Sequence, residues 1–308
     1  MAYINTVLGK IDIKNLGFTY THEHLLAHPP EWKRKEDPDL ELPSIECAII
    51  ELKKFYNAGG RTLVEGSTID YGREPERLKI IATQVPINIV CSTGFNKASY
   101  YPVWVKEIEF NDLVDLFVKE IEEGIGNTGI KAGQIKIGTS YNVITTTEEK
   151  VAAAAAKAQN ITKAPIWCHT ENGTMGIELL DILEKNGADI SKVAIGHSDR
   201  NADYKYHLDI LKRGAYLQFD GPGKIKYYPD STRIELIKRI INNGFENKLL
   251  ISGDMGRKSY LSAYGGGPGF EYIIKKFTKR MLEEGIEQKI INKIFIENPA
   301  NWLQIEKD

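Results

Sequence analysis

The sequence predicts an α/β protein with the (β/α)8 TIM-barrel fold, preceded by a short strand pair within residues 1–17. Short apolar runs typical of buried strands alternate about eight times with helical patterns, which is the signature of a closed parallel barrel. The rival fold, an open dinucleotide-binding sheet, would place a Gly-x-Gly-x-x-Gly motif after an early strand, and none is found. The sequence contains no obvious linker, so we expect residues 1–308 to form a single domain.

The expected strands are rich in Val, Ile, Leu or aromatic residues, and each is closed by glycine or a polar residue. In chain order they are Phe18–His24, Arg61–Ser67, Ile87–Thr93, Gln134–Thr139, Pro165–His169, Lys192–His197, Ala215–Phe219 and Lys248–Gly253. Helical patterns lie between them, at Ser44–Tyr56, Thr147–Ile161, Ser231–Ile241 and Phe270–Met281.

The composition argues against several kinds of partner. The 40 basic and 42 acidic side chains give a net charge of −2, whereas a nucleic-acid or membrane partner would favour a basic face. No apolar run reaches the roughly 20 residues of a membrane span, and the N-terminus lacks the pattern of a secretory signal. Only three cysteines are present, at Cys47, Cys91 and Cys168. We therefore expect a cytoplasmic protein without a disulfide framework, in which the cysteines are small buried residues.

Residues that can bind metal gather at the ends of the expected strands. His22 and His24 are two positions apart in one strand, so both imidazoles project from the same face and can share an ion. His169 and His197 end two later strands, and Asp254 follows the last one. Because TIM-barrel active sites lie at the C-terminal ends of the strands, these side chains are candidate metal ligands. The alternative, in which each histidine is an ordinary core or loop residue, would have to hold independently at every position.

Lys136 lies inside the expected strand Gln134–Thr139, where an ammonium group is costly to bury without a partner. A lysine that has lost its proton can react with carbon dioxide and form a carbamate, whose two oxygens can bridge two cations. From its residue type and position alone, two interpretations of Lys136 are equally open: it forms this carbamate, or it points outward and is solvated.

Six segments resemble the phosphotriesterase family of the amidohydrolase superfamily, and they occur in the family's order along the whole chain. They are GFTYTHEHL (17–25), KAGQIKIGTSY (131–141), CHTENGTMG (168–176), IGHSDRN (195–201), SGDMGR (252–257) and ENPANWL (297–303). The resemblance implies a centre of two divalent metal ions, with zinc expected and manganese, cobalt or iron as alternatives. The ligands it implies are His22, His24 and Asp254 on the buried metal, His169 and His197 on the more exposed metal, and a carboxylated Lys136 between the two.

The reaction implied by the resemblance is hydrolysis by a hydroxide that bridges the two metals and forms near neutral pH. Asp254 would take the proton from this nucleophile and pass it to the leaving oxygen, which makes it the expected catalytic residue.

The segments after the seventh and eighth expected strands indicate the substrate, because TIM barrels frequently bind phosphate there. Arg257 can offer a planar fork of donors, Tyr260 a hydroxyl and Lys226 a point charge. A structural alternative is that Arg257 pairs with Asp220 or Glu297. The pattern resembles the branch of the family that acts on phosphorylated sugar-acid 1,4-lactones. We therefore expect a lactonase whose small-molecule substrate is of the pentonolactone 5-phosphate type.

Five further residues are placed beside the expected site. Asn96 and Lys97, after the third expected strand, could face the site, but we expect them to be surface residues. Arg200 and Asn201, after the sixth, could support the ligands from behind. Glu23 alternates with the two histidines of its strand and should point away from them.

Two other functions are compatible with the same ligands. A phosphotriesterase or an acyl-homoserine lactonase would need an apolar pocket, but the loop after the eighth expected strand is short and polar. The alternative from another class of protein is a non-catalytic barrel that binds metal or a sugar phosphate. An acid/base group beside an open coordination position of the metal argues against this alternative. Relatives in the family are often homodimers, so a homodimer is the assembly to test.

Overall fold

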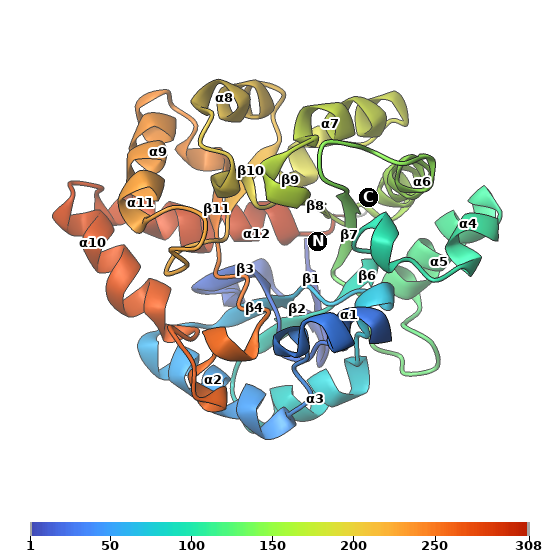
Figure 1. Cartoon of the computed structure of the whole chain (residues 1–308), viewed down its shortest axis with the longest axis horizontal. Coiled ribbons are helices and arrows are strands. Elements are labelled where there is room, and N and C mark those ends of the chain that lie inside the picture. The colour runs from blue at the N-terminus through green and yellow to red at the C-terminus, as the bar shows by residue number, and fades with distance from the viewer. Residues whose placement is uncertain (1, 307–308) are drawn as a thin grey trace.

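The computed structural model describes residues 2–306, which form a ring of parallel strands surrounded by helices (Figure 1). The strands are β1 (Ile4–Thr6), β2 (Gly9–Ile11), β3 (Thr19–Glu23), β4 (Thr62–Glu65), β5 (Asn88–Val90), β6 (Ser92–Gly94), β7 (Gln134–Thr139), β8 (Ile166–Thr170), β9 (Val193–Ile195), β10 (Tyr216–Phe219) and β11 (Leu249–Ile251). The helices are α1 (Glu31–Glu36), α2 (Ile45–Ala58), α3 (Pro75–Gln84), α4 (Trp104–Glu107), α5 (Phe110–Glu122), α6 (Thr146–Thr162), α7 (Gly176–Lys185), α8 (Tyr204–Lys212), α9 (Asp230–Asn242), α10 (Thr278–Glu283), α11 (Gln288–Asn292) and α12 (Asn298–Leu303).

The barrel strands pair in parallel and in chain order. β3, β4 and β5 form one hydrogen-bonded sheet, and β6 to β11 form the other. Because only Cys91 separates β5 from β6, these two short strands are the halves of one barrel strand. The described residues therefore confirm the (β/α)8 TIM barrel that the sequence predicts, with β3 as its first strand and β11 as its last.

Side chains and loop amides join the last barrel strand to the first. The Ser252 hydroxyl donates to the carbonyl of His22 (2.7 Å) and accepts from the His22 amide (3.1 Å). The buried carboxylate of Glu23 accepts from the amides of Gly253 and Met255 (2.8 Å for Met255). Glu23 thus points away from the histidines of its strand, as expected, and orients the loop that carries Asp254.

The expected N-terminal strand pair is confirmed and lies at the bottom of the barrel. β1 and β2 pair antiparallel, with Ile4 opposite Ile11. The amide of Val7 donates to the carbonyl of Ile89 (2.9 Å), and the Asn5 side chain donates to the carbonyl of Ala132 (2.9 Å). Ile89 lies in the first half of its barrel strand and Ala132 precedes β7, so both contacts are at the N-terminal end of the barrel.

The strands are shorter than the sequence suggests at two positions that matter for the site. β9 ends at Ile195 and β11 at Ile251, so His197 and Asp254 lie beyond their strands in left-handed backbone conformations (φ of 58° and 45°). A β-carbon at Gly196 would lie 2.2 Å from the Trp167 ring, so a glycine is required where the chain leaves β9.

A fully buried ion pair fixes the loop after β10. Arg233 of α9 donates from Nε to Asp199 (2.6 Å), and both side chains are 0% exposed. The same carboxylate accepts the amides of Asp220 (3.1 Å) and Gly221 (3.0 Å). A β-carbon at Gly221 would lie 2.3 Å from the Arg233 guanidinium. The ion pair therefore determines where the backbone places Asp220.

Two sequence expectations concern the chain as a whole. Within residues 2–306, no helix is long and apolar enough to cross a membrane. Cys47, Cys91 and Cys168 are unbonded; the last two are buried, and Cys47 is only partly buried. The expectation of small buried residues is thus confirmed at two of the three positions.

Replacement of Asp199 should destabilise the fold, because Asp199→Asn removes the closer carboxylate partner of the buried Arg233 and leaves Asp230, at 3.1 Å, as its remaining counter-charge. We expect the free energy of unfolding to fall by about 1.5–3 kcal/mol, the range for a lost hydrogen bond between charged groups, measured by urea denaturation. The matched control is Asp209→Asn on α8, whose side chain is 42% exposed and 4.0 Å from Lys212. It should change stability by less than about 0.5 kcal/mol. Equal stability of the two variants would contradict the role given to the pair.

Candidate active site

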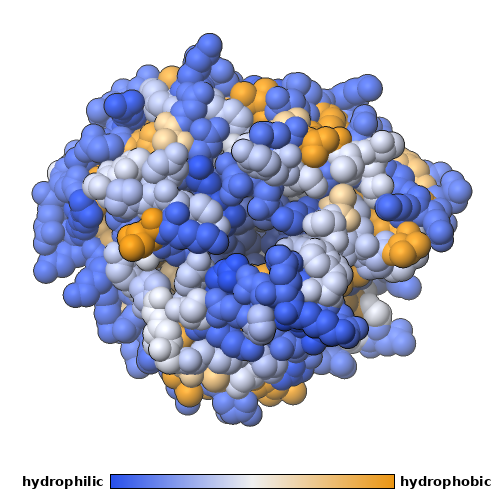
Figure 2. Space-filling model, viewed as in Figure 1, coloured by the Kyte–Doolittle hydropathy of each residue, from blue (hydrophilic) through white to orange (hydrophobic). Residues whose placement is uncertain are grey.

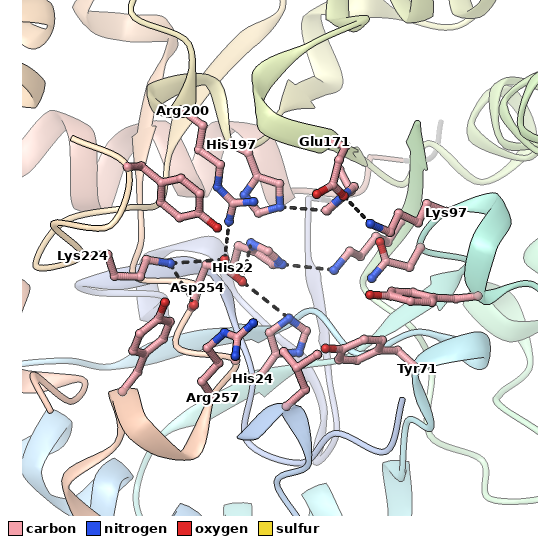
Figure 3. Close-up of a pocket in the computed structure, with 18 of the residues that line it drawn as sticks. His22, His24, Tyr71, Lys97, Glu171, His197, Arg200, Lys224, Asp254 and Arg257 are labelled. Carbon is pink, nitrogen blue, oxygen red and sulfur yellow. Dashed lines mark hydrogen bonds and ion pairs between the residues drawn. The ribbon is translucent and has the colours of Figure 1, made fainter. Parts of the chain in front are cut away.

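The expected metal ligands converge at the C-terminal mouth of the barrel (Figure 3). Lys136 Nζ lies 3.1 Å from His22 Nε2, and His169 Nδ1 lies 2.8 Å from His197 Nε2. His24 Nε2 is 3.7 Å from a carboxylate oxygen of Asp254. The structure therefore brings together all six residues singled out in the sequence, namely His22, His24, Lys136, His169, His197 and Asp254.

One carboxylate orients two of the imidazoles from below. Asp220 is 0% exposed; its Oδ1 lies 2.7 Å from His197 Nδ1 and its Oδ2 lies 3.4 Å from His22 Nδ1. Burial holds the pKa of both rings well below the ordinary histidine value, so the rings are neutral at neutral pH. With Nδ1–H donating to Asp220, Nε2 of each ring carries a lone pair, which is the form that binds metal.

The other two imidazoles are held in the same way by different partners. His24 Nδ1 lies 2.9 Å from the Ser67 hydroxyl, and His169 Nε2 lies 2.9 Å from the carboxylate of Glu171. Burial also lowers the pKa of His169. Each ring thus has one nitrogen hydrogen-bonded outside the cluster, and its other nitrogen faces the centre of the cluster.

Lys136 points into this cluster, so the alternative of an outward, solvated lysine is wrong. Its side chain is almost fully buried in β7, and Nζ donates to the carbonyl of Gly66 (2.8 Å). Burial lowers the pKa of Lys136 to about 8. The neutral amine, which is the form that reacts with carbon dioxide, is therefore more populated near neutral pH than it is in a solvated lysine. A β-carbon at Gly66 would lie 2.5 Å from the His22 ring, so only glycine fits beside it.

The two carboxylate oxygens of Asp254 have different neighbours: one faces two histidines, and the other pairs with two cations. Oδ1 faces His22 and His24 at 3.8 and 3.7 Å. Oδ2 accepts from Arg200 (2.7 Å) and from Lys224 (3.2 Å). Burial alone would raise the pKa of Asp254, but the nearby charges, led by Lys224, outweigh it and hold the pKa well below its ordinary value. Asp254 is therefore ionised at neutral pH.

These donors fit divalent transition-metal ions. The ligand atoms of His22, His24 and Asp254 lie within 4.8 Å of one another. Neutral imidazoles, an ionised carboxylate and a lysine that can form a carbamate are suitable ligands for zinc, manganese, cobalt or iron. A second group, His22, His197 and Asp220, is equally close, but its members already bond to one another through Nδ1. We interpret that second group as the support beneath the ligands.

A cavity of about 230 Å³ opens above the cluster, and Figure 2 shows a hollow in this face surrounded mainly by hydrophilic residues. The three residues expected to bind an anion, Lys226, Arg257 and Tyr260, all line it. Lys33 and Lys224, which the sequence did not single out, line it as well. The cavity is therefore rich in positive charge although the protein as a whole is slightly acidic.

Arg257 pairs with carboxylates that the sequence did not indicate. Its guanidinium lies 2.8 Å from Asp37 and 3.4 Å from Asp39, both in the segment after α1. The alternative pairing with Asp220 or Glu297 is wrong, because Asp220 lies beneath the histidines and no contact joins Arg257 to Glu297 within residues 2–306. Arg257 still faces the cavity, with its side chain 24% exposed.

Lys97, Asn96 and Arg200 face the site. Lys97 forms an ion pair with Glu171 and, like Asn96, lines the cavity, so neither residue is a solvated surface residue. Arg200 reaches Asp254, as the expectation of a supporting residue suggested.

Sequence reasoning missed the roles of Asp220, Glu171 and Lys224. Glu171 follows His169 by two residues, and this spacing was the one available signal. The order Lys224-Ile225-Lys226 gives no means of telling which lysine is buried.

A TIM barrel with four histidines, a buried lysine and an ionised aspartate at its mouth defines a metal-dependent hydrolase. The chain belongs to the phosphotriesterase family, whose sequence model matches residues 2–303.

Three relatives illustrate the similarity. A phospho-furanose lactonase of Mycoplasmopsis synoviae is 33% identical, over 99% of this chain and 92% of its own. The crystal structure of a lactonase from Listeria monocytogenes superposes with a TM-score of 0.95 at 39% identity, covering 99% of this chain and 100% of that one. The phosphotriesterase homology protein of Escherichia coli, complexed with phosphate in its active site, gives a TM-score of 0.90 at 35% identity, covering 96% and 100%.

The bridging role that the family resemblance implies for Lys136 predicts that its loss empties at least part of the metal centre, because the other side chains of the cluster cannot replace a bridging anion. We expect Lys136→Ala to retain one metal ion or fewer where the parent binds about two, measured by elemental analysis after loading and desalting. Added acetate or bicarbonate should partly restore the content. The control is Lys131→Ala, outside the cavity, which should keep both ions. Full metal content and activity in Lys136→Ala would disprove the bridging role.

Proposed function

We propose that the protein is a lactonase that opens a phosphorylated sugar-acid 1,4-lactone of the pentonolactone 5-phosphate type. The observation that carries the proposal is the cationic cavity directly above a cluster of metal-binding side chains. A lactone carbonyl is a neutral electrophile suited to the cluster, and a phosphate is a dianion suited to the cavity wall. A single small molecule with both groups would use both features.

We assign six side chains to a binuclear centre, by family and by their geometry. When bound, the two ions supply an electrophile for the carbonyl and lower the pKa of water. The proposed ligands are His22, His24 and Asp254 for one ion, His169 and His197 for the other, and a carboxylated Lys136 for both. We propose zinc as the native metal, with manganese, cobalt or iron as alternatives.

Asp254 is the proposed catalytic residue. Its ionised carboxylate presents Oδ1 toward the centre of the cluster, where it can accept a proton and deliver it to the leaving oxygen. Arg200 and Lys224 hold Oδ2, so the carboxylate cannot rotate away from the reacting atoms without breaking two ion pairs. Both cations act through Asp254 and are therefore positioning residues.

Lys226, Arg257 and Tyr260 are the proposed phosphate ligands. Arg257 supplies a planar pair of donors, Tyr260 a hydroxyl on a partly buried side chain, and Lys226 an exposed positive charge. The names of two relatives support the presence of a phosphate in this cavity. The Mycoplasmopsis synoviae relative acts on phospho-furanose lactones, and the Escherichia coli relative has phosphate in its active site.

The other functions considered from the sequence fit the cavity less well. A phosphotriesterase or an acyl-homoserine lactonase needs apolar walls, yet among the described lining residues Leu40 is the one aliphatic side chain. A barrel that binds ligands without catalysis would have no use for an ionised carboxylate between the ligands and two cations.

Three further statements stay proposals: that the protein is cytoplasmic, that it forms a homodimer, and that residues 1–308 are a single domain.

Paired lactones with and without the 5-phosphate test the proposal in a pH-indicator assay of the metal-loaded enzyme. The parent should prefer the phosphorylated lactone. Arg257→Ala should lower kcat/KM for that lactone about 10–100-fold, because a charge-assisted pair is lost, and change it less than about threefold for the other lactone. Metal content should stay unchanged.

The matched control is Lys258→Ala. Lys258 is the next residue along, but its Nζ donates to the carbonyl of Pro38 and does not line the cavity. This variant should keep the preference of the parent. Equal activity on both lactones, or none on either, would contradict the proposed substrate.

A further inference from the structure

Asn96 carries a side-chain amide that has no hydrogen-bond partner within residues 2–306. The residue is 6% exposed, lines the cavity, and its Oδ1 is among the buried atoms without a partner. Its backbone amide is fixed by both oxygens of Asp70 (2.9 and 3.0 Å), so the residue is held in place. Because an unpaired buried amide is costly, a fixed amide at a cavity wall is typical of a group that pairs with a ligand.

Lys97 and Glu171 extend the same wall. Lys97 Nζ and His169 Nε2 both bond to Oε2 of Glu171, so Oε1 makes no hydrogen bond with another described residue. The two side chains are 17% and 25% exposed, and both line the cavity. The ammonium of Lys97 keeps further donors, and Glu171 keeps one acceptor.

This wall lies across the cluster from Arg257, one of the proposed phosphate ligands. In Figure 3, Lys97 and Glu171 lie to the right of the histidines, whereas Lys224 and Arg257 lie to the left. A lactone with its phosphate at Arg257 and its carbonyl over the histidines would therefore direct its remaining ring carbons toward Asn96, Lys97 and Glu171. We call these three residues the distal wall.

The chemistry of the distal wall suits hydroxyl groups. Its amide both donates and accepts, its ammonium donates and its carboxylate accepts, and a hydroxyl likewise donates one hydrogen bond and accepts two. A second anion would be repelled by Glu171, and an aliphatic group would leave the Asn96 amide unpaired. We propose that Asn96, Lys97 and Glu171 recognise the ring hydroxyls of the lactone and make the enzyme selective for polyhydroxy over deoxy lactones. This inference rests on the proposed function.

The test compares a 5-phosphorylated pentono-1,4-lactone with its 2,3-dideoxy analogue, which keeps the phosphate and the ring ester. The quantity measured is the ratio of their kcat/KM values. In the parent enzyme the ratio should be about 100 or more, because a site built to bind hydroxyls is left with unpaired groups by the analogue. Asn96→Leu should lower this ratio at least about tenfold, mainly because kcat/KM for the hydroxylated lactone falls. Lys97→Met is a second, independent variant with the same expected direction.

The matched control is Lys226→Met at the other side of the cavity, which should slow both lactones equally and keep the ratio. Metal content should equal that of the parent in every variant. The inference would be overturned if the parent enzyme gave a kcat/KM ratio near one for the two lactones. It would also be overturned if Asn96→Leu and Lys97→Met both kept the ratio of the parent enzyme. In either case the proposed lactonase function would stand. If neither phosphorylated lactone is hydrolysed, the proposed function and this inference both fail.

Discussion

The buried carboxylate of Asp220 is the contact on which the rest of the site depends. Its two oxygens meet Nδ1 of His22, on the first barrel strand, and of His197, after the sixth. Both rings are thereby fixed with Nε2 toward the mouth of the barrel. The backbone of Asp220 is in turn held by Asp199, which is fully buried against Arg233 of α9. An outer helix thus orients the ligands through a continuous series of polar contacts.

The distribution of charge in the cavity would allow a slightly acidic protein to receive the phosphate of the proposed substrate. Positive side chains are concentrated at the cavity, whereas the net charge of the chain is −2. Several of these cations are balanced locally, Lys224 by Asp254 and Arg257 by Asp37. Local pairing limits the cost of keeping like charges close together, and a phosphate could exchange with a carboxylate at Arg257. Under the proposed function, selectivity for a phosphorylated substrate would therefore come from the placement of charge within the cavity.

The barrel and the positions of the ligands could be predicted from the sequence because both depend on local patterns. Strand periodicity placed His22, His24, His169, His197 and Asp254 at or just after the ends of expected strands, and Glu23 followed from alternation along its strand. The role expected of Lys136, which lies inside β7, came from the family resemblance. The left-handed turns at His197 and Asp254 could not be predicted, since they depend on tertiary packing such as that of Gly196 on Trp167. The roles of Asp220 and of the Arg257 partners also escaped prediction, because they join segments far apart in the chain.

The most direct test of the central claim is anomalous X-ray diffraction from crystals of the metal-loaded protein, recorded on both sides of the absorption edge of the metal. Two peaks are expected at the mouth of the barrel. One should lie among His22, His24 and Asp254, the other between His169 and His197, with extra density joining both to Lys136. A single peak against Asp220, or no bound metal under saturating conditions, would contradict the assignment of these residues as a binuclear hydrolytic centre.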